Sequence, residues 1–272
     1  MNAQTNRIDA AFAMLKESGH GGLMPFVCAG APTTDALTEV LPALSDAGAT
    51  VIEIGIPFSD PIADGPVIAA AMHDAITRGI TPAMIFEQVK SVRDQVESGI
   101  VAMVSVSLVH GMGGPEAFCV KAVDAGFDGC IFPDAPLEES AELAAACKSN
   151  NLTCSLLIAP TTPSDRAKEI AECCSGFIYL IARAGITGER NDAPEIAERV
   201  KALRAVTRLP IACGFGISTA DHVAAVVAHA DAAIVGTALV RRLESAKKSG
   251  DSLSAEAAEF ASELSVGLIS SQ

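Results

Sequence analysis

The chain has 272 residues, of which half are hydrophobic and only 4% aromatic, and its formal net charge is −14. No basic run compensates this charge, so nucleic acid and membrane surfaces are excluded as partners. The longest apolar segment, IVAMVSVSLV, is too short to span a bilayer, and MNAQTNRIDAAFAML at the N-terminus lacks the features of a signal peptide. We therefore expect a cytoplasmic protein.

Apolar runs of strand length alternate along the chain with segments of helical periodicity. The runs are LMPFVC from Leu23, VIEIG from Val51, IVAMVSVS from Ile100, GCIFP from Gly129, LTCSLLI from Leu152, FIYLI from Phe177, PIACG from Pro210 and AAIVG from Ala232. Helical segments such as DALTEVLPALSDAG and PEAFCVKAVDAG end in a glycine, which suits a left-handed helix C-cap before the next strand. Each predicted strand is thus followed by a helix.

Eight such units with no linker between them predict one domain over residues 1–272. The expected fold is an α/β (β/α)₈ TIM barrel with an extra N-terminal helix. A doubly wound open sheet is the alternative. Eight cysteines occur without a CxxC pair and lie mostly in apolar runs, so we expect them to be reduced core residues.

The segment VIEIGIPFSDPIADGP places an acid inside the second predicted strand. Because strand side chains alternate, Ile52 and Ile54 facing the outer helices would turn Glu53 toward the barrel axis. Functional groups of such barrels gather at the carboxyl ends of the strands, so Glu53 is a candidate for chemistry, with a structural ion pair as the alternative. The following loop carries Asp60 and Asp64; both suit turns or caps, and we assign that role to Asp60 first.

Glycine-rich segments follow the last three predicted strands, as ARAGITGER, CGFGIS and VGTALV. Backbone N–H groups near Gly188, Gly216, Gly236 and Thr237 would lie at helix N-termini, where phosphate binds. An acidic protein can hold a phosphate in this way. The alternative is that these glycines serve only tight turns.

All eight lysines fall in predicted helices or at their ends, so no strand offers a Schiff-base amine. The five histidines show no metal-ligand spacing, and no metal site is expected. The remaining chemistry is carboxylate acid/base catalysis on a phosphate-bearing substrate that supplies its own electron sink.

The runs PFVCAGAPT, IEIGIPFSDPIADGP, YLIARAGITG and GFGIS resemble the tryptophan synthase alpha subunit family over nearly the whole chain. The resemblance implies retro-aldol cleavage of indole-3-glycerol phosphate to indole and glyceraldehyde 3-phosphate. In that family a strand glutamate moves the protons, matching Glu53, and a loop aspartate accepts the indole N–H, matching Asp64. Tyr179 matches a pocket aromatic, and Thr187 matches a residue that positions its loop against the aspartate.

Four further positions differ from the family pattern or vary within the family. Ser105 and Ser107, in the predicted third strand, replace a packing aromatic and an amide, which predicts weaker binding of the indole ring. Leu23 matches a variable pocket position, and Thr237 keeps the hydroxyl of a common phosphate-loop serine.

The family also implies a partner, the tryptophan synthase beta subunit, in an α₂β₂ complex. Pyridoxal phosphate is expected only in that beta subunit, and no cofactor is expected in this chain. The alternatives are a catalytically weak alpha-like regulatory partner, a free-standing indole-3-glycerol phosphate lyase, or another phosphate-binding barrel enzyme. Indole-glycerol phosphate synthase is disfavoured, because it depends on strand lysines that this sequence lacks.

Overall fold

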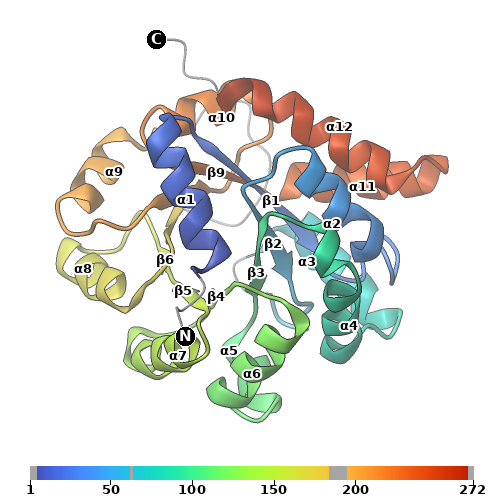
Figure 1. Cartoon of the computed structure of the whole chain (residues 1–272), viewed down its shortest axis with the longest axis horizontal. Helices are drawn as coiled ribbons and strands as arrows, with labels where there is room; N and C mark the ends of the chain where they lie inside the picture. The colour runs from blue at the N-terminus through green and yellow to red at the C-terminus, as the bar shows by residue number, and fades with distance from the viewer. Residues whose placement is uncertain (1–4, 62–63, 184–194, 269–272) are drawn as a thin grey trace.

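The protein is a ring of helices around a parallel sheet (Figure 1). The computed structural model describes residues 5–61, 64–183 and 195–268. Its strands are β1 (Gly22–Cys28), β2 (Val51–Gly55), β3 (Gly99–Met103), β4 (Gly129–Ile131), β5 (Thr153–Ser155), β6 (Leu157–Ile158), β7 (Ile178–Ile181), β8 (Ile211–Gly214) and β9 (Ala232–Val235).

Helices separate the strands along the chain, as predicted, except that β6 follows β5 directly. They are α1 (Arg7–Ser18), α2 (Leu37–Asp46), α3 (Pro66–Thr77), α4 (Pro82–Val92), α5 (Val106–Gly111), α6 (Pro115–Ala125), α7 (Leu137–Ser149), α8 (Ser164–Cys173), α9 (Ala197–Arg204), α10 (Ala220–Val227), α11 (Thr237–Ser249) and α12 (Leu253–Ser265). Short 3₁₀ turns, η1 (Arg93–Gln95) and η2 (Val266–Leu268), follow α4 and α12. Helix α6 begins with Pro115, and the residue after its last turn, Gly126, has φ 95° and forms the glycine cap that the sequence predicts.

The sheet order is β5-β4-β3-β2-β1-β9-β8-β7-β6, and its pairs are parallel. The strands at the two ends of this order, β5 and β6, are consecutive in the chain and are separated only by Leu156. Strand β5 pairs with β4, and β6 pairs with β7. The carbonyl of Leu156 itself accepts a hydrogen bond from Tyr179 N at 3.2 Å. The predicted fifth strand is therefore split in two. The sheet closes through it, which confirms the barrel and rules out the open doubly wound sheet.

The two faces of the barrel strands carry separate apolar clusters. Val51 packs in the inner cluster with Met24 and Val101, whereas Ile52 and Ile54 belong to the outer cluster beneath the helices. The alternation predicted for this strand is confirmed. All eight cysteines are free thiols, six of them buried.

One predicted boundary was wrong. The third strand ends at Met103 and does not reach Ser107, because the chain turns into α5. Ser105 is the N-cap of that helix, and its hydroxyl accepts from Ser107 N at 3.2 Å. Apolar alternation through VSVS hid this local capping signal.

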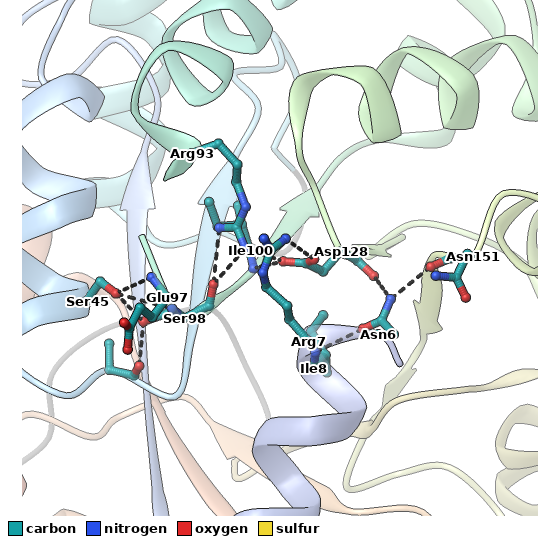
Figure 2. Close-up of polar contacts among 11 residues, drawn as sticks. Asn6, Arg7, Ile8, Ser45, Arg93, Glu97, Ser98, Ile100, Asp128 and Asn151 are labelled. Carbon is teal, nitrogen blue, oxygen red and sulfur yellow. Dashed lines mark hydrogen bonds and ion pairs between the residues drawn. The ribbon is translucent and has the colours of Figure 1, made fainter. Parts of the chain in front are cut away.

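Helix α1 lies across one end of the barrel and is anchored there by a polar network (Figures 1 and 2). Asn6 caps the helix, accepting from Ile8 N at 2.9 Å, and its amide donates to the carbonyls of Asp128 at 2.7 Å and Asn151 at 2.9 Å. Buried Asp128 also accepts from Arg93 at 3.1 Å and from Ile100 N at 2.8 Å. The expected N-terminal helix thus closes the end of the barrel at which the strands begin.

Candidate active site

A cavity of about 320 Å³ opens at the carboxyl ends of the strands. Its lining comes from nearly every strand or from the loop that follows it. These residues include Phe26, Glu53, Phe58, Asp60, Asp64, Met72, Met103, Ser105, Asp134, Leu157, Tyr179, Phe215, Gly216, Ile217, Ile234, Gly236 and Thr237. The cavity is mostly apolar and of a size that suits a small organic ligand.

Glu53 lines this cavity and is itself 0% exposed. Neither of its carboxylate oxygens has a hydrogen-bond partner among the described residues. Burial, with a smaller effect from the nearby charge of Asp64, raises the pKa of Glu53 to about 8. The side chain is therefore mostly protonated at neutral pH and presents a proton to whatever occupies the cavity.

Asp64 lines the same cavity from the loop between β2 and α3. Its burial raises its pKa to about 6, so it is mostly ionised at neutral pH. Asp60 also borders the cavity, but it is exposed and accepts a hydrogen bond from the Ser59 hydroxyl at 2.6 Å. The two lining acids that are not exposed thus differ in protonation: Glu53 is mostly neutral and Asp64 is mostly negative.

Aromatic side chains form part of the apolar wall, and glycines make room for them. A Cβ atom on Gly214 would lie 2.6 Å from the Tyr179 hydroxyl, and one on Gly55 would lie 2.5 Å from the Phe26 ring. Tyr179 and Phe215 meet edge to face, with ring centroids 6.4 Å apart. Phe215 has φ 83°, which is strained for an aromatic residue and is typical of functional sites.

One side of the cavity is suited to an anion. Gly216, Gly236 and Thr237 all line it, as their loops predict. Helix α11 begins at Thr237, and its N-cap Gly236 has no side chain to satisfy the first N–H groups. The first N–H groups of the helix, which no described side chain caps, and the positive end of the helix dipole favour a phosphate at this place.

Ser105 lines the cavity but is held by another residue. Its hydroxyl donates to Asp134 at 2.6 Å, and the other carboxylate oxygen of Asp134 accepts from Val106 N at 2.9 Å. Ser107 is exposed in α5. Of the two serines predicted to affect binding of the indole ring, only Ser105 lies at the cavity.

Leu23 was wrongly predicted as a pocket residue. It is fully buried in the outer cluster beneath the helices and is not part of the cavity lining. The reason is strand alternation: Phe26, three residues further along β1, faces the cavity. Thr187 and Gly188 lie outside the described residues.

Several lining residues were missed from the sequence. Asp134 follows β4 in the run FPD, and Phe215 lies between two glycines in GFG. An acid directly after a strand was a usable signal for Asp134. Met72, Met103 and Leu157 had no such signal, because apolar residues in a cavity and in a core look alike in sequence.

The chain offers few other groups for chemistry. All eight lysines lie within helices, as predicted. Over the described ranges, no cluster of His, Cys, Asp and Glu is arranged to hold a metal ion. The site therefore combines the carboxyl groups of Glu53 and Asp64 with an aromatic wall and a helix N-terminus.

The model of the family described as "Tryptophan synthase alpha chain" matches residues 12–268. The chain belongs to the tryptophan synthase alpha chain family. Relatives with that name include one from a Synechococcus strain, 43% identical over 96% of this chain and 97% of its own length. Another, from Chloroflexus aggregans, is 42% identical over 88% of this chain and 90% of its own.

Solved structures of tryptophan synthase share the fold. The alpha chain from Legionella pneumophila superposes with a TM-score of 0.88 at 29% identity, covering 99% of this chain and all of that one. A chain of the Mycobacterium tuberculosis tryptophan synthase gives a TM-score of 0.87 at 27% identity, covering 97% and 99%. The likeness extends over the whole barrel.

Proposed function

We propose that this tryptophan synthase alpha chain cleaves indole-3-glycerol phosphate to indole and glyceraldehyde 3-phosphate, in tryptophan biosynthesis. The observation that carries this proposal is the pairing of a buried, proton-bearing Glu53 with an ionised Asp64 in one apolar cavity. The cavity also ends at an uncapped helix N-terminus. An indole ring suits the apolar wall, and a phosphate suits the helix end.

Glu53 moves the protons of the reaction. Its neutral carboxyl gives a proton to C3 of the indole ring, which makes the ring an electron sink. The carboxylate that results takes the proton of the hydroxyl on the side-chain carbon bonded to C3. That carbon becomes the aldehyde as its bond to C3 breaks, and the electrons of the bond restore the indole.

Asp64 stabilises the charge that develops on the ring. Protonation at C3 leaves a positive charge on the ring nitrogen, and a carboxylate that accepts the N–H is favoured most in that state. Tyr179 and Phe215 hold the ring, while Thr237, Gly216 and Gly236 hold the phosphate. Thr187 and Gly188, which follow β7 in the sequence, remain expected contributors.

The partner of the chain in this proposal is the tryptophan synthase beta subunit, as the family name implies, in an α₂β₂ complex. Indole is small and apolar, so handing it to a docked beta subunit prevents its loss to solvent. Pyridoxal phosphate belongs to that subunit and supplies the chemistry that joins indole to serine.

None of the described helices has both the length and the apolar character to cross a bilayer.

Release of indole from indole-3-glycerol phosphate tests the proposal. Glu53→Gln keeps the size of the side chain but removes its proton transfer, so turnover should fall by ~10²–10⁴. Binding of glycerol 3-phosphate by the same variant should stay unchanged, which would show that the cavity is intact. Near-normal turnover in Glu53→Gln would contradict the role of this carboxyl, and no indole release by the natural chain with its beta subunit would favour the regulatory alternative.

A further inference from the structure

A second cavity, of about 440 Å³, lies at the opposite end of the barrel, beside the end of α1. Its lining comes from the segments that lead into β1, β8 and β9. The lining residues used below are Leu15, Lys16 and His20 near the end of α1, Arg204 and Arg208 ahead of β8, and Val227, His229 and Asp231 ahead of β9. The strands begin here, so this cavity is separated from Glu53 by the interior of the barrel.

The lining is cationic in a chain whose net charge is −14. Lys16, Arg204 and Arg208 face the same space, together with His20 and His229. Asp231 is the one acidic residue among the described residues of the lining. Local positive charge of this kind draws anions to a protein that repels them elsewhere.

Ion pairs within the protein neutralise only part of this positive charge. Asp231 accepts from Arg204 at 2.6 Å and from the backbone N of Ile211 at 2.6 Å, so this acid is already neutralised. Lys16 and Arg208 have no ion pair or side-chain hydrogen bond within residues 5–61, 64–183 and 195–268. Within the described part of the chain, these two cations thus remain beside the cavity without an anion that pairs with them.

We propose that this second cavity binds a small organic phosphate. Arginine presents a planar fork that matches phosphate oxygens, lysine adds a point charge, and imidazole N–H groups can donate at the edge. The cavity is much larger than a phosphate group, and Leu15 and Val227 add an apolar wall. A phosphate monoester with a ring-sized body fits this combination better than inorganic phosphate does.

The test is a titration of the ¹⁵N-labelled full chain followed by amide NMR, with inorganic phosphate and adenosine 5′-monophosphate as separate probes. Sodium chloride at matched ionic strength reports screening alone. Amides of Gly19, Gly21 and Ala230 report the second cavity, and those of Gly236 and Thr237 report the active-site cavity. The two sites are therefore followed separately in one experiment, so this inference and the proposed function can fail independently.

We expect saturable shifts at Gly19, Gly21 and Ala230 with adenosine 5′-monophosphate, and weaker or no binding of inorganic phosphate. The double variant Lys16→Gln/Arg208→Gln should raise the dissociation constant roughly five- to tenfold, as the loss of two exposed charge contacts would give. Lys201→Gln, an exposed lysine on α9 that does not line the cavity, is the matched control.

Shifts that never saturate, or that sodium chloride reproduces, would show screening only and overturn the proposal. Unchanged affinity in the double variant would overturn it as well. A Thr237→Val chain should keep this binding intact, because Thr237 belongs to the other cavity. If inorganic phosphate binds as tightly as the monoester, the site recognises phosphate alone and the argument from the apolar wall is wrong.

Discussion

Glu53 combines the proton that we propose for catalysis with a cost in stability. Both follow from one feature, a carboxyl buried at 0% exposure with no hydrogen-bond partner in the described chain. Burial favours the neutral form, which makes Glu53 a proton donor at neutral pH. The same burial makes ionisation of the folded state unfavourable.

The pH dependence of stability should expose this cost. The pKa of Glu53 rises from 4.5 to about 8 on folding. Between these values the folded chain binds one more proton than the unfolded chain, so the contribution of Glu53 to the free energy of unfolding falls as pH rises and levels off above pH 8. Glu53→Gln removes this loss and should stabilise the chain at pH 8 by roughly 2–4 kcal/mol.

Urea denaturation of both chains at pH 5 and pH 8 measures this effect. The stability gained by Glu53→Gln should be large at pH 8 and small at pH 5. Asp60→Asn, at an exposed acid, is the control and should change stability little at either pH. A gain of equal size at both pH values would show that the Glu53 carboxyl does not ionise as proposed.

Substitution of the two loop aspartates, Asp64 and Asp60, should have different effects on the kinetics of cleavage. Asp64→Asn removes the charge that we propose stabilises the protonated ring, so kcat and kcat/KM should fall together by ~10²-fold while KM changes little. Asp60→Asn lies at the exposed edge and should stay within about threefold of the natural chain. Steady-state assays of indole release measure both, and equal losses would contradict the division.

Asn6 anchors the start of helix α1, next to the ion pair of Arg7 with Asp128 at 3.4 Å. Asn6 caps the helix and also bonds to two carbonyls of the barrel, those of Asp128 and Asn151 (Figure 2). Asn6→Ala should therefore lower the free energy of unfolding by roughly 2–3 kcal/mol, since it loses a cap and two buried hydrogen bonds.

Ser252→Ala is the matched control for this element. Ser252 caps α12 by accepting from Ala255 N at 3.2 Å, but no hydrogen bond from its side chain to the barrel is present in the described structure. Its loss should cost only about 1 kcal/mol. Urea denaturation compares the two, and equal losses would mean that the contacts of Asn6 to the barrel add nothing to its cap.

At the scale of the whole molecule, the beta subunit should raise turnover without adding a catalytic group. The acids sit at one end of the barrel, and Asp64 belongs to a loop there, between β2 and α3. A partner that favours a closed arrangement of such loops excludes water and holds Asp64 in place. We expect a complex between the two purified subunits and faster indole release within it.

Sedimentation and the indole assay, each with and without the beta subunit, check this prediction. Asp64→Asn should still form the complex but gain little rate from it. If no complex forms and the isolated chain already cleaves at its full rate, a free-standing lyase describes the protein better.

The single domain over residues 1–272 also stays a prediction, supported by the continuous closed sheet.

The sequence by itself determined the barrel and the direction of Glu53. Both depend on local periodicity: apolar runs alternate with helical segments, and side chains alternate along a strand. Ile52 and Ile54 could be assigned to the outer face from that rule, and the structure agrees. The predicted end of the third strand was wrong because Ser105 and Ser107 continue the polar and apolar alternation of a strand, whereas their hydrogen bonds belong to the start of a helix.

Only the tertiary structure decided the protonation of the acids and the make-up of the wall. The pKa of a carboxyl depends on its burial and on the charges that the fold brings close to it, as it brings Asp64 close to Glu53. Leu23 and Phe26 are both apolar residues of one strand, and closure of the barrel decides which of them meets the ligand. The cationic second cavity could not be predicted from the sequence for a similar reason. Its residues Lys16, Arg208 and His229 lie apart in the sequence and come together only in the folded chain.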